Sequence, residues 1–167
     1  MLPLRLGIDT NILVSAANKT AGSQRIFLLF AIIRPARLYM SRPIIEKYSE
    51  VVPRPELQIR KGLRLQLLEL IKNHSHTVVP ARRLDVPSDL DGHMFLECGN
   101  TARADYPVTG NQKHFPRFWK KTKITTREFI GLAAPHLINR KVGRFNIRAI
   151  SLLPGIRQFQ RQGFCDI

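Results

Sequence analysis

Polar side chains follow two of the short apolar runs in this sequence, where a metal ion could be bound. Asp9 comes directly after residues 4–8, and Asn111 follows residues 106–109. Each run is short and apolar, which is typical of a buried strand in a parallel sheet. Ligands of such sheets bind beyond the carboxyl ends of the strands, and Mg²⁺ and Mn²⁺ prefer oxygen ligands. The pattern indicates a metal site able to activate water for attack on a phosphodiester. The alternative for Asp9 is a turn or helix-capping residue.

Strand-like and helical segments alternate along the chain and would position these side chains. We predict strands at 4–8, 38–40, 77–79, 106–109 and 123–125, with helices at about 24–33, 43–52, 57–71, 93–102 and 126–137. The residues Asp9, Thr10 and Asn11 are expected to form a polar turn after the first strand. This alternation predicts an α/β fold, a three-layer α/β/α sandwich around a mostly parallel sheet of four or five strands.

The chain divides into a domain and a basic extension. Residues 1–137 contain all the predicted elements, whereas residues 138–167 show no clean apolar period. The extension holds six basic residues and one acidic residue, a net charge of +5, so +10 belongs to residues 1–137. The positive charge is therefore a property of the domain as well as of the extension.

The net charge of +15 over 167 residues indicates a polyanionic partner. Nucleic acid, anionic lipid and an acidic protein all fit this charge. Six cations, which include Lys113, Arg117, Lys120 and Lys121, are interleaved with aromatic residues and suit an RNA groove, because cations neutralise phosphates and rings stack on bases. The alternative is that these aromatic residues pack in the core or under a loop.

The cysteines and the apolar runs predict a cytoplasmic protein. Cys98 and Cys165 lie far apart, without a CxxC pair or a neighbouring histidine cluster, which suits a reducing compartment. The sequence shows no secretory signal pattern at its start. Its longest apolar run, residues 26–33, is far shorter than the ~20 residues that span a bilayer. We expect no membrane insertion.

Several ordered blocks stand out in the sequence, at residues 8–16, 41–55, 95–98, 102–106, 108–111, 114–116 and 126–129. Together they cover roughly residues 5–137 and resemble the PIN-domain family, especially the toxin components of bacterial toxin–antitoxin pairs. The resemblance implies an α/β/α fold and an acidic site that uses Mg²⁺ or Mn²⁺ to cleave RNA. It also implies a homodimer inhibited by a small antitoxin protein.

The resemblance assigns the first two acidic positions of the site. Asp9 matches the first acid and is the firmest metal ligand. The second acid of the family normally precedes the tyrosine of the second block, and Lys47 stands there instead. Glu46 lies about 100° away around the helix, and Glu50 lies one turn later on nearly the same face. Either glutamate is a candidate ligand, and the Lys47 ammonium is a candidate for binding an RNA phosphate.

The remaining positions are matched in part. Asp91 retains the acid of the third block, whereas Gly92 and His93 depart from it; His93 would either approach a metal or sit solvated at a helix start. Asn111 takes the fourth position, where its carbonyl oxygen is a neutral donor. Thr10 and Asn11 would orient the Asp9 carboxylate or close the turn.

Asp105 also matches the family, but it precedes the fourth strand. About four strand residues, roughly 13 Å, then separate it from the level of Asp9. We therefore predict a structural role for it.

Three functions remain open from the sequence. The leading one is a metal-dependent endoribonuclease with Asp9, Glu46, Asp91 and Asn111 in its site. The second is a PIN-fold protein with a degraded site that binds RNA or an antitoxin without cleavage, with Lys47 filling the metal position. The third is a DNA- or membrane-surface binder that uses residues 138–167.

Overall fold

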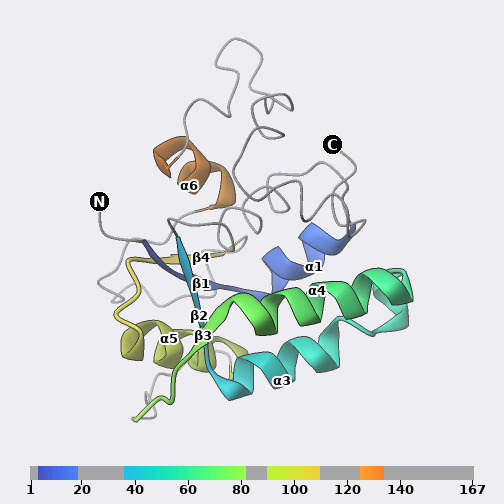
Figure 1. The fold of residues 1–167 in the computed structure, drawn as a ribbon, viewed down its shortest axis with the longest axis horizontal. Helices are drawn as coiled ribbons and strands as arrows, with labels where there is room; N and C mark the ends of the chain where they lie inside the picture. The colour runs from blue at the N-terminus through green and yellow to red at the C-terminus, as the bar shows by residue number, and fades with distance from the viewer. Residues whose placement is uncertain (1–3, 19–35, 82–89, 110–124, 134–167) are drawn as a thin grey trace.

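The structure is a computed structural model, and it describes residues 4–18, 36–81, 90–109 and 125–133. The predicted helix at 24–33, most of the predicted strand at 123–125 and the extension at 138–167 lie outside these residues. The described residues form a sheet with helices packed around it (Figure 1).

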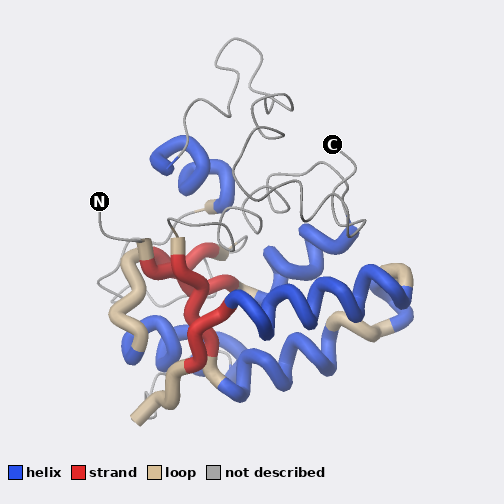
Figure 2. The backbone as a smooth tube through the Cα atoms, viewed as in Figure 1, coloured by secondary structure: helices blue, strands red, loops and turns tan. Residues whose placement is uncertain are grey.

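The sheet contains four parallel strands in the order β3-β2-β1-β4. Figure 2 draws the strands in red. They are β1 (Arg5–Ile8), β2 (Arg37–Met40), β3 (Ser75–Thr77) and β4 (Tyr106–Val108). Leu6 is the Cα partner of Leu38 on one side and of Tyr106 on the other, so β1 is a central strand.

The helices are α1 (Thr10–Asn18), α3 (Arg42–Val51), α4 (Lys61–His74), α5 (Leu90–Thr101) and α6 (Thr126–Ala133). The connections from β1 to β2 and from β2 to β3 step across the sheet in one direction, whereas the connection from β3 to β4 steps back. Because such crossovers are right-handed, α1, α3 and α4 lie on one face and α5 on the other. Figure 1 agrees, with α1, α3 and α4 grouped together. The predicted three-layer α/β/α architecture is confirmed.

The core forms where the alternating side chains of the strands meet these helices. β1 and β2 share the same pattern, with Leu6, Ile8, Leu38 and Met40 buried and the intervening residues more exposed. These four pack with apolar residues of α1, α3 and α4 in one cluster, which includes Ile12, Leu13, Ile44, Tyr48, Leu67 and Ile71. Burial on one face holds the register, because a slip by one residue would expose every apolar side chain.

The predicted turn after the first strand was wrong, because α1 starts there. The Asp9 carbonyl oxygen accepts hydrogen bonds from the Ile12 and Leu13 amides at 3.1 and 3.5 Å. Asp9 is therefore the residue that precedes the first turn of α1, and Thr10 and Asn11 open the helix.

Three other boundaries also differ from prediction. Pro55–Leu57 forms a separate 3₁₀ turn and Gln58 has a φ of 48°, so α4 begins at Lys61 and not at residue 57. β3 is Ser75–Thr77 and not 77–79, and Val79 is 84% exposed. α5 begins at Leu90, three residues before its predicted start, which brings Asp91 into its first turn.

In the described part of the chain, no helix is long and apolar enough to cross a membrane.

Candidate functional site

Asp9 stands at the carboxyl end of β1 and joins this central strand to α1. Its amide donates to the Val108 carbonyl oxygen at 3.1 Å, which extends the pairing of β1 with β4 by one residue. Its half-buried carboxylate accepts a hydrogen bond from the Thr109 hydroxyl, with 2.7 Å between Oγ1 and Oδ2. Thr109 itself is completely buried. The end of the neighbouring strand therefore orients the Asp9 carboxylate.

Tyr48 holds the peptide group next to Asp9. Its hydroxyl donates to the Ile8 carbonyl oxygen at 2.5 Å, and the residue is 1% exposed. The registered pairs of β1 with β2 are Arg5 with Arg37 and Leu6 with Leu38, so Ile8 lies beyond them. The tyrosine from α3 thus satisfies a carbonyl that β2 does not pair. Burial raises the pKa of Tyr48 well above its usual value, and the Asp9 carboxylate adds to that rise.

The two glutamates considered for the second acidic position have other partners. Glu46 forms an ion pair with Arg42 at 2.8 Å, and Glu50 forms one with Arg54 at 2.5 Å. Both glutamate side chains are more than 60% exposed. Tyr48 occupies the inner face of α3, and Lys47 beside it is half-buried.

No metal-binding group of three or more acidic, histidine or cysteine side chains forms within the described residues. Asp9, Glu46 and Glu50 therefore do not come together as one site. Asp9 is a hard oxygen donor held in a fixed orientation, and it fits one position of a Mg²⁺ or Mn²⁺ shell.

α5 brings the third block toward this edge of the sheet. Asp91 lies in the first turn of α5, and its side chain is outside the described structure. His93 is half-buried, and its Nε2 atom is buried without a hydrogen-bonding partner in the described part of the chain. The expectation of a solvated histidine is therefore wrong at that nitrogen, because packing removes it from water.

Asp105 lies at the opposite end of β1. Its Oδ2 accepts from the Arg5 amide at 2.7 Å, and its own amide donates to the Arg5 carbonyl oxygen at 2.8 Å. These paired contacts join the start of β1 to the residue before β4. Asp105 therefore serves the sheet and is remote from Asp9, as we predicted from its place before the fourth strand.

The other candidates separate into two groups. Thr10 and Asn11 are the first residues of α1, and Thr109 makes a described contact to the Asp9 carboxylate. Thr109 is the site residue that our sequence reasoning missed. Its signal was a hydroxyl at the end of the strand before Asn111, which gains meaning only once β4 is known to neighbour β1. The remaining candidates lie outside the described residues: Asn111, Lys113, Arg117, Lys120 and Lys121.

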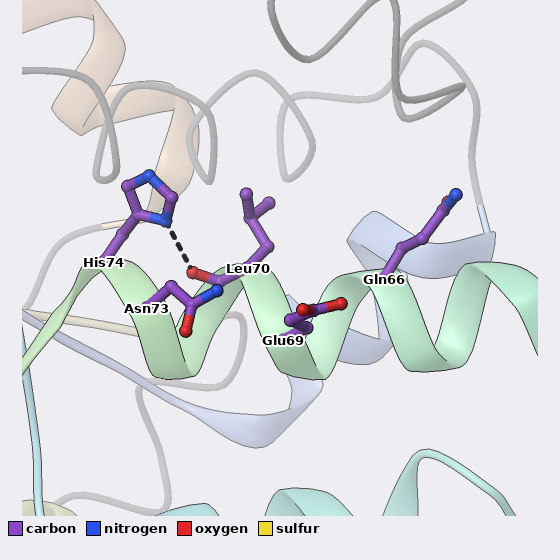
Figure 3. Close-up of a pocket in the computed structure, with 5 residues that line it drawn as sticks. All are labelled: Gln66, Glu69, Leu70, Asn73 and His74. Carbon is purple, nitrogen blue, oxygen red and sulfur yellow. Dashed lines mark hydrogen bonds between the residues drawn. The ribbon is translucent and has the colours of Figure 1, made fainter.

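A separate cavity of about 310 Å³ lies along α4. Its described lining is Gln66, Glu69, Leu70, Asn73 and His74, and the His74 Nδ1 atom lies 2.9 Å from the Leu70 carbonyl oxygen (Figure 3). All of these residues belong to one helix, and none is a candidate from the sequence. The cavity is distinct from the edge of the sheet that carries Asp9.

Comparison with known proteins agrees with this arrangement. A family model described as a PIN domain matches residues 5–113, which include β1 to β4 and Asp9. Neither a curated protein nor a solved structure matches the chain. PIN domains are in general metal-using nucleases that bind RNA. Because the match covers more than half of the sequence and all four strands, this chain belongs to the PIN-domain family.

Proposed function

We propose that this protein is a metal-dependent endoribonuclease and the toxin component of a bacterial toxin–antitoxin pair. The observation that carries the proposal is the oriented Asp9 carboxylate at the carboxyl edge of the sheet. The edge is where parallel sheets bind ligands. The net charge of +15 supports a polyanionic substrate.

Asp9 would hold Mg²⁺ or Mn²⁺, and Asp91 and Asn111 are the further donors that the sequence offers. Such an ion activates water and stabilises negative charge on a phosphodiester. Thr109 keeps one carboxylate oxygen of Asp9 in place. The N-terminus of α1, which starts at the next residue, favours negative charge at this point.

RNA cleavage in the presence of Mn²⁺ tests the nuclease proposal. We expect the wild-type protein to cleave a single-stranded RNA and Asp9→Asn to lose at least about tenfold in rate, because the neutral amide is a weaker metal ligand. Asp105→Asn is the matched control, since it removes one carboxylate charge at the opposite end of β1. Equal cleavage by wild type and Asp9→Asn, or none by wild type, would refute the proposal.

A second candidate is a PIN-fold protein that binds RNA or an antitoxin without cleavage. The outward ion pairs of Glu46 and Glu50, with Lys47 beside Tyr48, favour it, because no acid of α3 then replaces the missing one. Cleavage by Lys47→Glu together with no cleavage by wild type would support this candidate. Cleavage by wild type would exclude it.

The partners also belong to the proposal. As a toxin, the protein would form a homodimer and bind a small antitoxin protein. Sedimentation of the purified protein measures whether it forms the proposed homodimer.

A further inference from the structure

The sheet carries polar side chains on the face opposite to α1, α3 and α4. Side chains of neighbouring residues in a strand point to opposite faces, so Arg5 and Gly7 of β1 share a face with Arg37 and Tyr39 of β2. His76 of β3 is the Cα partner of Tyr39 and points the same way. We call these five residues the polar sheet face. Arg5, Arg37 and His76 are exposed, and Tyr39 is half-buried.

Two features keep this face open beside α5. The helix contacts β1, β4 and, to a smaller extent, β2, so the part over β2 and β3 is left exposed. At Gly7, one residue beyond the Leu6–Leu38 pair, no described atom lies within 4 Å of the position that a Cβ would take. Within the described residues, the sheet surface at Gly7 is therefore open.

The polar sheet face pairs two aromatic rings. The Tyr39 and His76 rings lie with their centroids 5.3 Å apart and their planes tilted by 31°. Adjacent rings on an exposed sheet surface are the arrangement on which single-stranded nucleic acids stack their bases. A ring pair of this kind adds little to the core, because His76 is exposed.

The same face pairs two cations. Arg5 and Arg37 are Cα partners on adjacent parallel strands, so two positively charged residues are neighbours on one face. The Arg5 guanidinium donates to the Ala102 carbonyl oxygen at 3.2 Å, a neutral partner. No acidic side chain in the described part of the chain forms an ion pair with Arg37. A phosphate group would give the exposed Arg37 guanidinium an anionic partner.

We propose that the polar sheet face binds single-stranded RNA, with Arg37 and Arg5 on the phosphates and Tyr39 and His76 stacked on bases. Arg37 and Tyr39 are two residues apart along β2, so the cation pair and the ring pair are separated by about 7 Å. The strands run from them toward Asp9, so bound RNA would extend from the amino end of the sheet toward its carboxyl edge. The inference names a substrate-binding surface and rests on the proposed RNA substrate, but not on cleavage.

Binding of a labelled RNA in the absence of metal tests the proposal. The probe is a single-stranded RNA of about 12 nucleotides, long enough for the ~4–16 nucleotides that such surfaces cover, followed by fluorescence anisotropy in EDTA. We expect Arg37→Ala to weaken binding several-fold and to reduce the slope of log K against log salt by about 0.7, the value for one phosphate contact on a single strand. Lys61→Ala is the control: it removes one exposed charge at the start of α4.

The aromatic pair is tested separately. Tyr39→Leu should weaken binding roughly tenfold, in line with the loss of one stacked base, whereas Tyr39→Phe should bind like wild type. His76→Ala removes the other ring of the pair at an exposed position, where the substitution should not prevent folding. It therefore tests stacking even if Tyr39→Leu does not fold. The proposal is overturned if Arg37→Ala, Tyr39→Leu and His76→Ala all bind like Lys61→Ala. It is also overturned if duplex RNA binds as tightly as the single strand, because charge alone would then suffice.

The results of these binding tests do not depend on whether the protein cleaves RNA. Loss of cleavage in Asp9→Asn together with weakened RNA binding by Arg37→Ala supports both proposals. RNA binding through the polar sheet face by a protein that never cleaves supports this inference and refutes the nuclease.

Discussion

Among the described residues, the Thr109 hydroxyl orients the Asp9 carboxylate. Thr109 is completely buried, and its Oγ1 atom lies 2.7 Å from the Asp9 carboxylate. We expect Thr109→Val, which keeps the shape of the side chain, to lower the free energy of unfolding by about 1.5–3 kcal/mol, the range for a hydrogen bond to a charged group. Thr109→Ser keeps the hydroxyl and should lose less.

A double-mutant cycle in urea isolates this contact. In an Asp9→Ala background the acceptor is gone, so Thr109→Val should cost less than it does in wild type. An equal cost in both backgrounds would show that the loss comes from packing around Thr109 and not from the contact with Asp9.

At the same scale, the sequence could identify Asp9 but not its surroundings. Asp9 follows an apolar run, and this position can be recognised from the sequence alone. The direction of the Glu46 and Glu50 side chains depends on which residue of α3 points toward the sheet. Tyr48 is that residue, and its hydroxyl donates to the Ile8 carbonyl oxygen. The glutamates are then left to Arg42 and Arg54, four residues away along the chain. Thr109 gained its role only from the pairing of β1 with β4.

At the scale of elements, Tyr48 joins α3 to the end of β1. Tyr48→Phe would leave the buried Ile8 carbonyl oxygen without this donor, and we expect a loss of about 1–3 kcal/mol in the free energy of unfolding. Tyr39→Phe is the matched control, because the Tyr39 side chain is half-buried and should lose less than about 0.5 kcal/mol. Urea denaturation of the two variants makes the comparison. Equal losses of unfolding free energy in the two variants would mean that the Tyr48 hydroxyl does not stabilise the packing of α3 against β1.

The elements that were predicted correctly are those with a clear apolar pattern. β1, β2 and β4 fall within a residue of their predicted bounds, because each is short, apolar and closed by polar residues. We predicted β3 too far along the chain, at the apolar residues Val78 and Val79. The strand is formed instead by polar residues, at the edge of the described sheet. α1 was missed because Asp9, Thr10 and Asn11 are all typical turn residues. The same residues can start a helix, and only the hydrogen bonds to the Asp9 carbonyl decide between the two.

At the scale of the whole molecule, the sheet separates its proposed activities along the strands. The carboxyl edge carries Asp9 and Thr109, and the amino end carries Asp105 with the two arginines of the polar sheet face. The hydrophobic core of the molecule is one apolar cluster that joins α1, α3 and α4 to β1 and β2. Anything that weakens this cluster therefore weakens both ends of the sheet.

The buried Cys98 thiol makes the stability of the molecule sensitive to alkaline pH. Burial raises its pKa from 9.0 to about 12, and the Ser41 hydroxyl offsets a smaller part of that rise. Below about pH 9 the thiol is protonated in the folded and unfolded chains, and its stabilising contribution is complete. As the pH rises from 9 toward 12, the unfolded thiol ionises first, so the unfolded state is favoured by about 1.4 kcal/mol per pH unit. Tyr48, whose pKa is also raised, adds a loss of the same sign.

Urea denaturation at about pH 8 and about pH 11 measures this loss. We expect wild type to lose up to about 3 kcal/mol more than Cys98→Ala over that interval, because the variant has no thiol to ionise at this position. Cys165 is present in both proteins, and the comparison uses the change with pH, so the packing cost of the substitution cancels. Equal losses in the two proteins would contradict the prediction, since the unfolded Cys98 would then gain nothing by ionising.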